Sequence, residues 1–189
     1  MKATIIVLSF FLVSNAFAQR QAWKPDFATT QYAGSIGFVS GGFGYRVFKD
    51  KAKVSFHYGF VPASKGGPLN IVASKLLFNT WKIKISNSVD VCPLSAGIMI
   101  SYHFGEALNS SWAEYRYPKG YYWWRPSIRA HINTQSSIVV KLKDKRIKSM
   151  DYFIDVNSND LYLVSYFQNR KALGLTDILK VGYGVKVNF

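Results

Sequence analysis

The chain has 189 residues, with 24 Lys or Arg against 10 Asp or Glu, and its formal net charge is +14. This length suits one domain, and 31 aromatic residues (5 Trp, 12 Tyr and 14 Phe) accompany 14 Gly. The single cysteine, Cys92, excludes an internal disulfide and a cysteine-based metal site.

The N-terminus has the layout of an export signal. Lys2 precedes an apolar stretch over 5–13, and Ala16-Phe17-Ala18 forms a small-x-small cleavage site. The stretch is too short for a spanning helix, which needs about 20 residues, and polar or glycine residues interrupt every later apolar run. We therefore expect a signal peptide over 1–18 and one exported domain over 19–189. The alternative is that the signal is retained as a membrane anchor.

The positive charge narrows the expected partners. For an exported chain, the polyanions within reach are phosphorylated lipid head groups, especially lipopolysaccharide, and cell-wall polymers. A nucleic-acid partner is not expected, because the sequence has no basic helix, zinc module or aromatic RNA-binding motif.

Alternation of apolar and polar residues predicts eight strands, near 25–32, 35–48, 53–61, 70–82, 91–104, 121–134, 147–167 and 177–189. A tight polar turn at 49–52 lies at one end, and longer loops at 62–68, 105–120 and 168–176 lie at the other. The segment 135–146 is long for a turn and leaves room for a hairpin extension. The seventh strand fits worst, because polar residues at 157–160 interrupt its apolar face. A bulge there, or extension above a bilayer, would reconcile it.

The alternation also predicts which side chains share a face. The apolar face includes Val39, Phe43, Tyr45, Val47, Val54, Phe56, Tyr58, Phe60, Leu94, Ala96, Ile98, Ile100, Tyr102, Phe104, Tyr122, Trp124, Ile128 and Ile132. The polar face carries all three histidines, His57, His103 and His131, and the charged residues Arg46, Lys75, Arg125, Arg129, Asp151, Asp155, Lys180 and Lys186. Inside a closed barrel these cations and acids must pair.

The last strand shows the pattern most clearly, because every second residue from Leu179 to Phe189 is apolar or aromatic. With the N-terminal signal, this strand resembles the closing strand of bacterial outer-membrane β-barrels of the OmpA/OmpX size class. The resemblance implies an all-β fold, an antiparallel transmembrane β-barrel of eight strands in the outer membrane. It also implies recognition by the barrel-assembly machinery through the C-terminal strand ending at Phe189. The alternative is a secreted β-sandwich whose apolar rows face a core.

The resemblance says nothing of a specific activity, so the first functional hypothesis is a non-enzymatic barrel with a structural, adhesive or lipopolysaccharide-contacting role. It needs no cofactor. The aromatic run 121–124 is predicted to lie at the outer interface as a girdle, with a carbohydrate-stacking platform as the alternative. The candidate lipopolysaccharide contacts are Lys65, Arg116, Lys119, Arg170 and Lys171.

The second hypothesis is a lipid A-modifying hydrolase. Ser101 and His103 share a strand face about 7 Å apart, and a neighbouring strand is expected to bring His131 or Asp151 close, as a nucleophile, base and acid require. The outer-membrane lipid A deacylases are small barrels with a His-x-Ser pair and a downstream Glu. The order here is reversed, Ser101-Tyr102-His103, so no catalytic role is carried over from them. A third hypothesis is a narrow pore, whose conductance would depend on Arg125 and Arg129.

Overall fold

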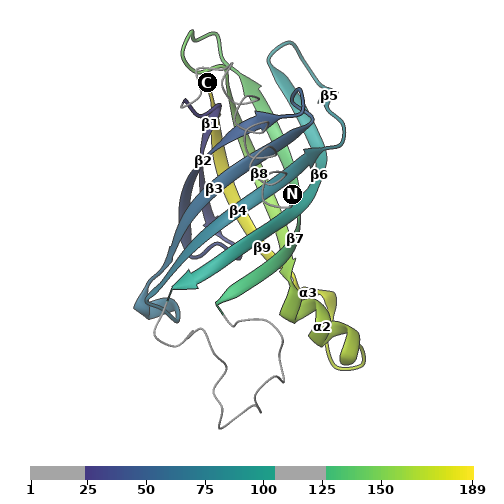
Figure 1. Cartoon of the computed structure of the whole chain (residues 1–189). Helices are drawn as coiled ribbons and strands as arrows, with labels where there is room; N and C mark the ends of the chain where they lie inside the picture. Colours follow the sequence, from purple (N-terminus) through teal and green to yellow (C-terminus); the bar gives the residue numbers. More distant parts are fainter. Residues whose placement is uncertain (1–23, 105–126) are drawn as a thin grey trace, which may run out of the picture.

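The computed structural model describes residues 24–104 and 127–189, which form an antiparallel β-barrel (Figure 1). The predicted signal peptide and the aromatic run 121–124 lie outside the described residues. The strands are β1 (Phe27–Ala33), β2 (Val39–Val47), β3 (Ala52–Val61), β4 (Leu69–Asn79), β5 (Ile83–Lys84), β6 (Val89–Phe104), β7 (Ile128–Lys141), β8 (Ser149–Asn159) and β9 (Lys180–Asn188). The helical elements are η1 (Ala63–Lys65), α2 (Asp160–Gln168) and α3 (Leu175–Ile178).

Two non-sequential pairings close the sheet. β1 pairs with both β2 and β9, and β4 pairs with β3 and β6, so eight long strands form a ring. β5 is a two-residue strand that pairs only with the start of β6. Each long strand therefore has a hydrogen-bonded neighbour on both sides, and the ring has no free edge. The predicted eight-stranded antiparallel barrel is confirmed.

The outside of this ring is apolar. Large apolar side chains on all eight long strands are exposed, and we call them the apolar belt: Tyr32, Val39, Phe43, Phe56, Tyr58, Phe60, Val72, Phe78, Leu94, Ile98, Ile100, Tyr102, Phe104, Ile128, Ile132, Ile138, Tyr152, Ile154, Val181 and Tyr183. Although Tyr45, Val47, Val54 and Ala96 are half-buried, most of the predicted outward positions are exposed. A β-sandwich would bury these residues in a core, so that alternative is wrong.

The inside of the ring is polar. The buried inward-facing side chains include Thr29, Gln31, Ser40, Ser55, His57, Lys75, Ser95, Ser101, Arg129, His131, Asn133, Gln135, Asp151, Asp155, Asn157, Lys186 and Asn188. The three histidines thus lie on the face that alternation predicts. Arg125 lies outside the described residues.

Two glycines make room for rings inside the barrel. A Cβ on Gly44 would overlap the ring of Phe27, and one on Gly184 would overlap the ring of Phe153. Between these two rings lies the Lys186 ammonium, 5.0 Å from the Phe27 centroid and 5.4 Å from that of Phe153. The interior is therefore filled by aromatic rings that hold a cation.

A bulge interrupts β6 near its start. Cys92 pairs with Ser137 and Ser95 with Gln135, so Pro93 and Leu94 together oppose one residue of β7. Proline has no N–H for the ladder, and a bulge is where a paired strand tolerates it. The extra residue shifts the parity of the alternation by one, so Cys92 and Ser95, three positions apart, both lie buried on the inward side.

The predicted seventh strand, 147–167, is wrong in its second half. β8 ends at Asn159, and α2 follows instead of a bulge or a strand extension. The Asn159 side chain accepts a hydrogen bond from the Tyr162 amide at 2.8 Å, and this cap begins the helix. α3 likewise occupies the start of the predicted last strand.

The predicted sixth strand, 121–134, is confirmed from Ile128 onward and extends further than predicted, because β7 runs from Ile128 to Lys141. The segment 135–146 is therefore not one long turn: its first part pairs with β8 as far as Lys141 with Ser149. This is the hairpin extension for which the sequence left room. Residues 121–126 of the predicted strand lie outside the described residues.

The two ends of the barrel differ. The end that holds the last residue of β9 has the connections 48–51, 80–88 and 142–148, whereas the other end has 34–38, 62–68 and 160–179. This agrees with the predicted sidedness of the turns. No helix among residues 24–104 and 127–189 is long and apolar enough to cross a membrane.

Gly97 and Gly41 provide a matched test of close packing between strands. A Cβ on Gly97 would overlap the Leu76 carbonyl oxygen of β4, whereas a Cβ on Gly41 meets nothing within 4 Å. We expect Gly97→Ala to lower the free energy of unfolding by roughly 1–3 kcal/mol, because the β4–β6 pair must move apart. Gly41→Ala is the control and should change it little. Urea titration in detergent measures both, and equal effects would contradict the assigned approach of β4 to β6.

Candidate functional site in the barrel interior

Ser101, His103 and His131 meet inside the barrel. The Ser101 hydroxyl lies 2.9 Å from His103 Nε2 on the same strand and 2.8 Å from His131 Nε2 on β7. The β6–β7 register brings His131 close, because Met99 pairs with His131 and Ser101 lies two residues further along β6. The predicted approach of His131 to Ser101 is therefore confirmed.

A hydroxyl between two imidazoles can donate to one ring and accept from the other. A hydrolytic triad also needs a carboxylate that orients the base through its second nitrogen. His131 Nδ1 is buried and has no hydrogen-bond partner among the described residues. The described geometry therefore provides a nucleophile and a base, but no orienting acid at that nitrogen.

Asp151 does not lie near Ser101, which corrects one of the two predicted approaches. Asp151 pairs in register with Val139, eight residues along β7 from His131, or about 27 Å along the strand. Its carboxylate instead accepts a hydrogen bond from Asn188 Nδ2 at 2.7 Å and lies 3.7 Å from Lys53 Nζ.

A fully buried ion pair inside the barrel joins β4 to β8. Lys75 Nζ lies 3.0 Å from Asp155 Oδ1, with 2% of Lys75 and 0% of Asp155 exposed. Asn157 Nδ2 donates to the second carboxylate oxygen at 3.1 Å, and Ser35 Oγ donates to Asn157 Oδ1. The carboxylate is thus held by a cation and an amide, as a buried charge requires.

A small cavity and a fully buried hydroxyl characterise the described interior. A cavity of about 10 Å³ lies among Phe27, His57, Lys75 and Lys186, which is room for about one water molecule. Ser101 is 0% exposed. Its hydroxyl is enclosed between two imidazoles, so the cluster has the features of a packed polar core.

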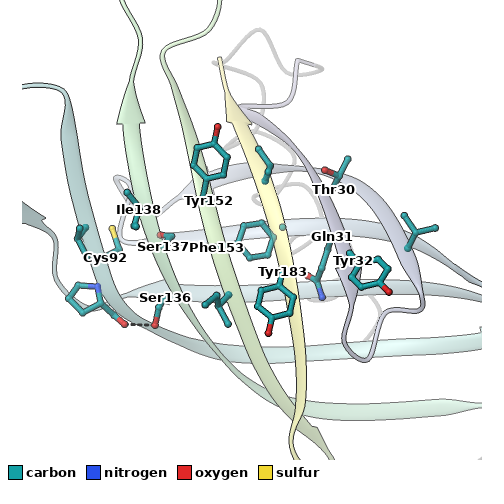
Figure 2. A pocket seen from close by; sticks show the side chains of 16 residues that line it. Thr30, Gln31, Tyr32, Cys92, Ser136, Ser137, Ile138, Tyr152, Phe153 and Tyr183 are labelled. Atoms are coloured by element: carbon teal, nitrogen blue, oxygen red, sulfur yellow. Dashed lines mark hydrogen bonds between the residues drawn. The ribbon is translucent and has the colours of Figure 1, made fainter.

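Two larger hollows lie outside this core. One is a mainly apolar groove of about 730 Å³, which crosses β1, β9, β8 and β7 and reaches residues of β2 and β6 (Figure 2). Tyr32, Tyr183 and Ile154 line one row across it, in register from strand to strand. Its walls combine members of the apolar belt with the buried residues Gln31, Cys92, Ser137 and Phe153.

The other hollow, of about 550 Å³, lies at the barrel end that holds the last residue of β9. Basic and acidic side chains both line it, and its charged members are Arg46, Asp50, Lys53, Lys82, Lys141, Asp144, Lys148 and Asp151. The backbone N–H groups of Ile147 and Arg146 lower the pKa of Asp144. With cations and acids both present, this mouth has no charge pattern that selects one ligand.

The candidate lipopolysaccharide contacts lie at the opposite end where the structure describes them. Lys65 is exposed in η1, and Arg170 and Lys171 are exposed between α2 and α3. The Arg170 guanidinium lies 4.9 Å from the centroid of the Phe167 ring. Arg116 and Lys119 lie outside the described residues.

The sequence interpretation missed three interior partners: Lys53, Asn157 and Asn188. Lys53 lies at inward parity on β3, so extending the alternation by one step would have found it, whereas Asn188 already belongs to the polar row of the last strand and only its partners were missed. The signal for Asn157 was hidden by the wrong bulge at 157–160. Arg46 Nη2 donates to Asn188 Oδ1 at 3.0 Å, so Asn188 joins Arg46 to Asp151.

Among residues 24–104 and 127–189, no group of three or more His, Cys, Asp or Glu side chains is placed to hold a metal ion. No family model, curated protein or solved structure matches this chain.

The Lys75–Asp155 pair offers a test of how the interior is held. Asp155→Asn leaves the Lys75 ammonium buried without its counter-ion, so we expect a loss of about 3–5 kcal/mol in the free energy of unfolding. The double variant Lys75→Met/Asp155→Leu removes both charges and should recover most of that loss. Urea unfolding in detergent measures the cycle. A double variant as unstable as the single one would show that the two residues do not act as a pair.

Proposed function

We propose that this protein is a small integral β-barrel of a bacterial outer membrane. Its role is structural or adhesive and non-enzymatic, and its basic loops contact lipopolysaccharide. The observation that carries the proposal is the apolar belt around a polar, packed interior. Soluble monomers rarely expose apolar patches beyond a few hundred Å², whereas a barrel in lipid turns its apolar side chains outward.

The height of the belt fits a bilayer. On β6 its members run from Leu94 to Phe104, a separation of ten positions or about 34 Å along the strand. At the usual tilt of about 35–45°, this spans roughly 24–28 Å along the barrel axis, against an apolar band of about 25 Å in outer-membrane barrels.

The sequence supports the choice of membrane. The predicted signal peptide over 1–18 exports the chain, and outer-membrane barrels have short turns on the periplasmic side and longer loops outside. This orientation places the turns 48–51 and 142–148 in the periplasm and the segment 160–179 outside.

The two other hypotheses have less support. A pore needs a continuous lumen, whereas the described interior is filled by rings and an ion pair around a cavity of about 10 Å³. A lipid A hydrolase needs an accessible nucleophile, whereas Ser101 is fully buried among the described residues.

The first test is recovery of the protein from outer-membrane fractions, with gel mobility compared before and after boiling. A folded barrel in detergent should migrate differently from the boiled chain.

Ile98→Arg, in the middle of the belt, should reduce the folded fraction in bilayers, because a cation facing mid-membrane lipid costs about 2–4 kcal/mol. Ile83→Arg is the control: Ile83 is exposed on β5, beside Lys84 and outside the belt, and its replacement should have little effect.

Recovery as a soluble periplasmic protein with no mobility shift would contradict the proposal. So would equal folding of Ile98→Arg and Ile83→Arg in bilayers, because the belt would then not face lipid.

The lipopolysaccharide contact is tested by removing three cations from one end of the barrel in one variant and three from the opposite end in another. Lys65→Gln/Arg170→Gln/Lys171→Gln should weaken binding to purified lipopolysaccharide and leave the gel-mobility shift intact. The matched control Lys143→Gln/Lys145→Gln/Arg146→Gln removes three cations from the opposite turn and should bind as the parent does. Each contact with an anionic head group contributes about 1 kcal/mol, so three contacts correspond to roughly a hundredfold loss. Equal binding by the two variants would refute the contact.

A further inference from the structure

Helix α2 is apolar on all sides and buries none of its residues. Six of its nine residues are Leu, Tyr, Val or Phe, yet no side chain in it is buried. Phe167 is 61% exposed, and Leu175 in α3 is 58% exposed. A helix that is apolar all round is normally covered by protein or by lipid.

The helix lies beside the rim of the apolar belt. α2 contacts β7 and β8, and its N-cap Asn159 pairs in register with His131. β7 continues from His131 to Ile128, whose neighbour on β6 is Tyr102, and both are belt residues. Figure 1 shows α2 and α3 projecting beyond the ends of β7 and β8. The apolar surface of α2 therefore continues the apolar outer surface of the barrel.

Cations lie against the rings of this segment. Arg170 lies over Phe167 at 4.9 Å, and Lys180 lies over Tyr162 at 5.0 Å, while Lys171 is exposed next to Arg170. Of the two acids of the segment, Asp160 lies in the first turn of α2, where the helix dipole favours a negative charge, and Asp177 accepts a hydrogen bond from the Gly174 amide at 2.8 Å. Aromatic and aliphatic side chains beside cations are the chemistry of a lipid head-group boundary.

We propose that the segment 160–179 is a membrane-interface anchor. Its Val164, Phe167 and Leu175 side chains enter the outer leaflet, and Arg170 and Lys171 contact anionic head groups. The inference rests on the proposed membrane placement of the barrel. It adds an element that binds the lipid surface beside the strands that span it.

The experiment uses the full chain with its cysteine removed by Cys92→Ala. An environment-sensitive fluorophore is attached through Phe167→Cys or Leu175→Cys, and the protein is folded into phosphatidylcholine–phosphatidylglycerol vesicles. Brominated phosphatidylcholine quenches a label in lipid, and iodide quenches a label in water. Ile98→Cys calibrates the lipid environment, and Lys145→Cys, on the turn 142–148, calibrates water.

We expect labels at positions 167 and 175 to show blue-shifted emission, quenching by brominated lipid and loss of iodide quenching. Iodide quenching equal to that at position 145 would overturn the anchor. Protection from both quenchers would also overturn it, because protein, such as residues 105–126 or another chain, would then cover the helix. If position 98 is not quenched by lipid either, the proposed membrane placement fails first, so the two failures are distinguishable.

The head-group contact has its own readout. Adding phosphatidylglycerol to phosphatidylcholine vesicles should shift the emission at position 175 further to the blue. Arg170→Gln/Lys171→Gln should abolish this additional shift, whereas Lys143→Gln/Lys145→Gln should retain it. A shift that survives in the first variant would refute the role of these two cations.

Discussion

Every other feature of this protein depends on the main-chain hydrogen bonds that join β1 to β9 and β4 to β6. Once these pairs close the sheet, a strand residue has only two places for its side chain, inside or outside the ring. Successive side chains point to opposite faces, so sequence parity fixes the environment of each residue. A register slip of one residue in β6 would turn Ile98 inward and Ser101 outward, against both the apolar belt and the polar core.

The small diameter of an eight-stranded ring then determines the chemistry of its interior. Such a ring has space for side chains and little else, so each large group needs a small one nearby. Gly44 and Gly184 provide that space for Phe27 and Phe153, and the Lys186 ammonium lies between the rings. The same crowding buries Ser101 between two imidazoles. A group that resembles a catalytic pair in sequence therefore becomes part of the packing.

Alternation was sufficient to predict which residues face outward, because that property depends only on position along one strand. It was not sufficient to predict partners across strands, which depend on register. Thus His131 reaches Ser101 whereas Asp151 does not, although both lie at inward parity.

Alternation also failed at α2. Tyr162, Val164 and Tyr166 alternate as in a strand, but the neighbouring Leu161, Leu163 and Phe167 are apolar as well, so the segment has no polar face. The cap at Asn159, with the first-turn acid Asp160, is the local signal that favours a helix. A strand interpretation had to add a bulge at this point, where the chain begins a helix.

The two ends of the barrel have opposite consequences for its depth in a bilayer. At the end near 142–148, Lys141, Lys143, Lys145 and Lys148 follow the last belt residue of β7, Ile138. Moving this end into lipid would expose cations, whose cost rises from about 0–1 kcal/mol at the interface to about 2–4 kcal/mol at the midplane. Moving the barrel the other way would bring the Phe167 and Leu175 side chains out of the leaflet and into water. In the proposed placement both displacements are unfavourable, so the lysine-rich turn and the apolar helix together fix the position of the barrel along the membrane normal.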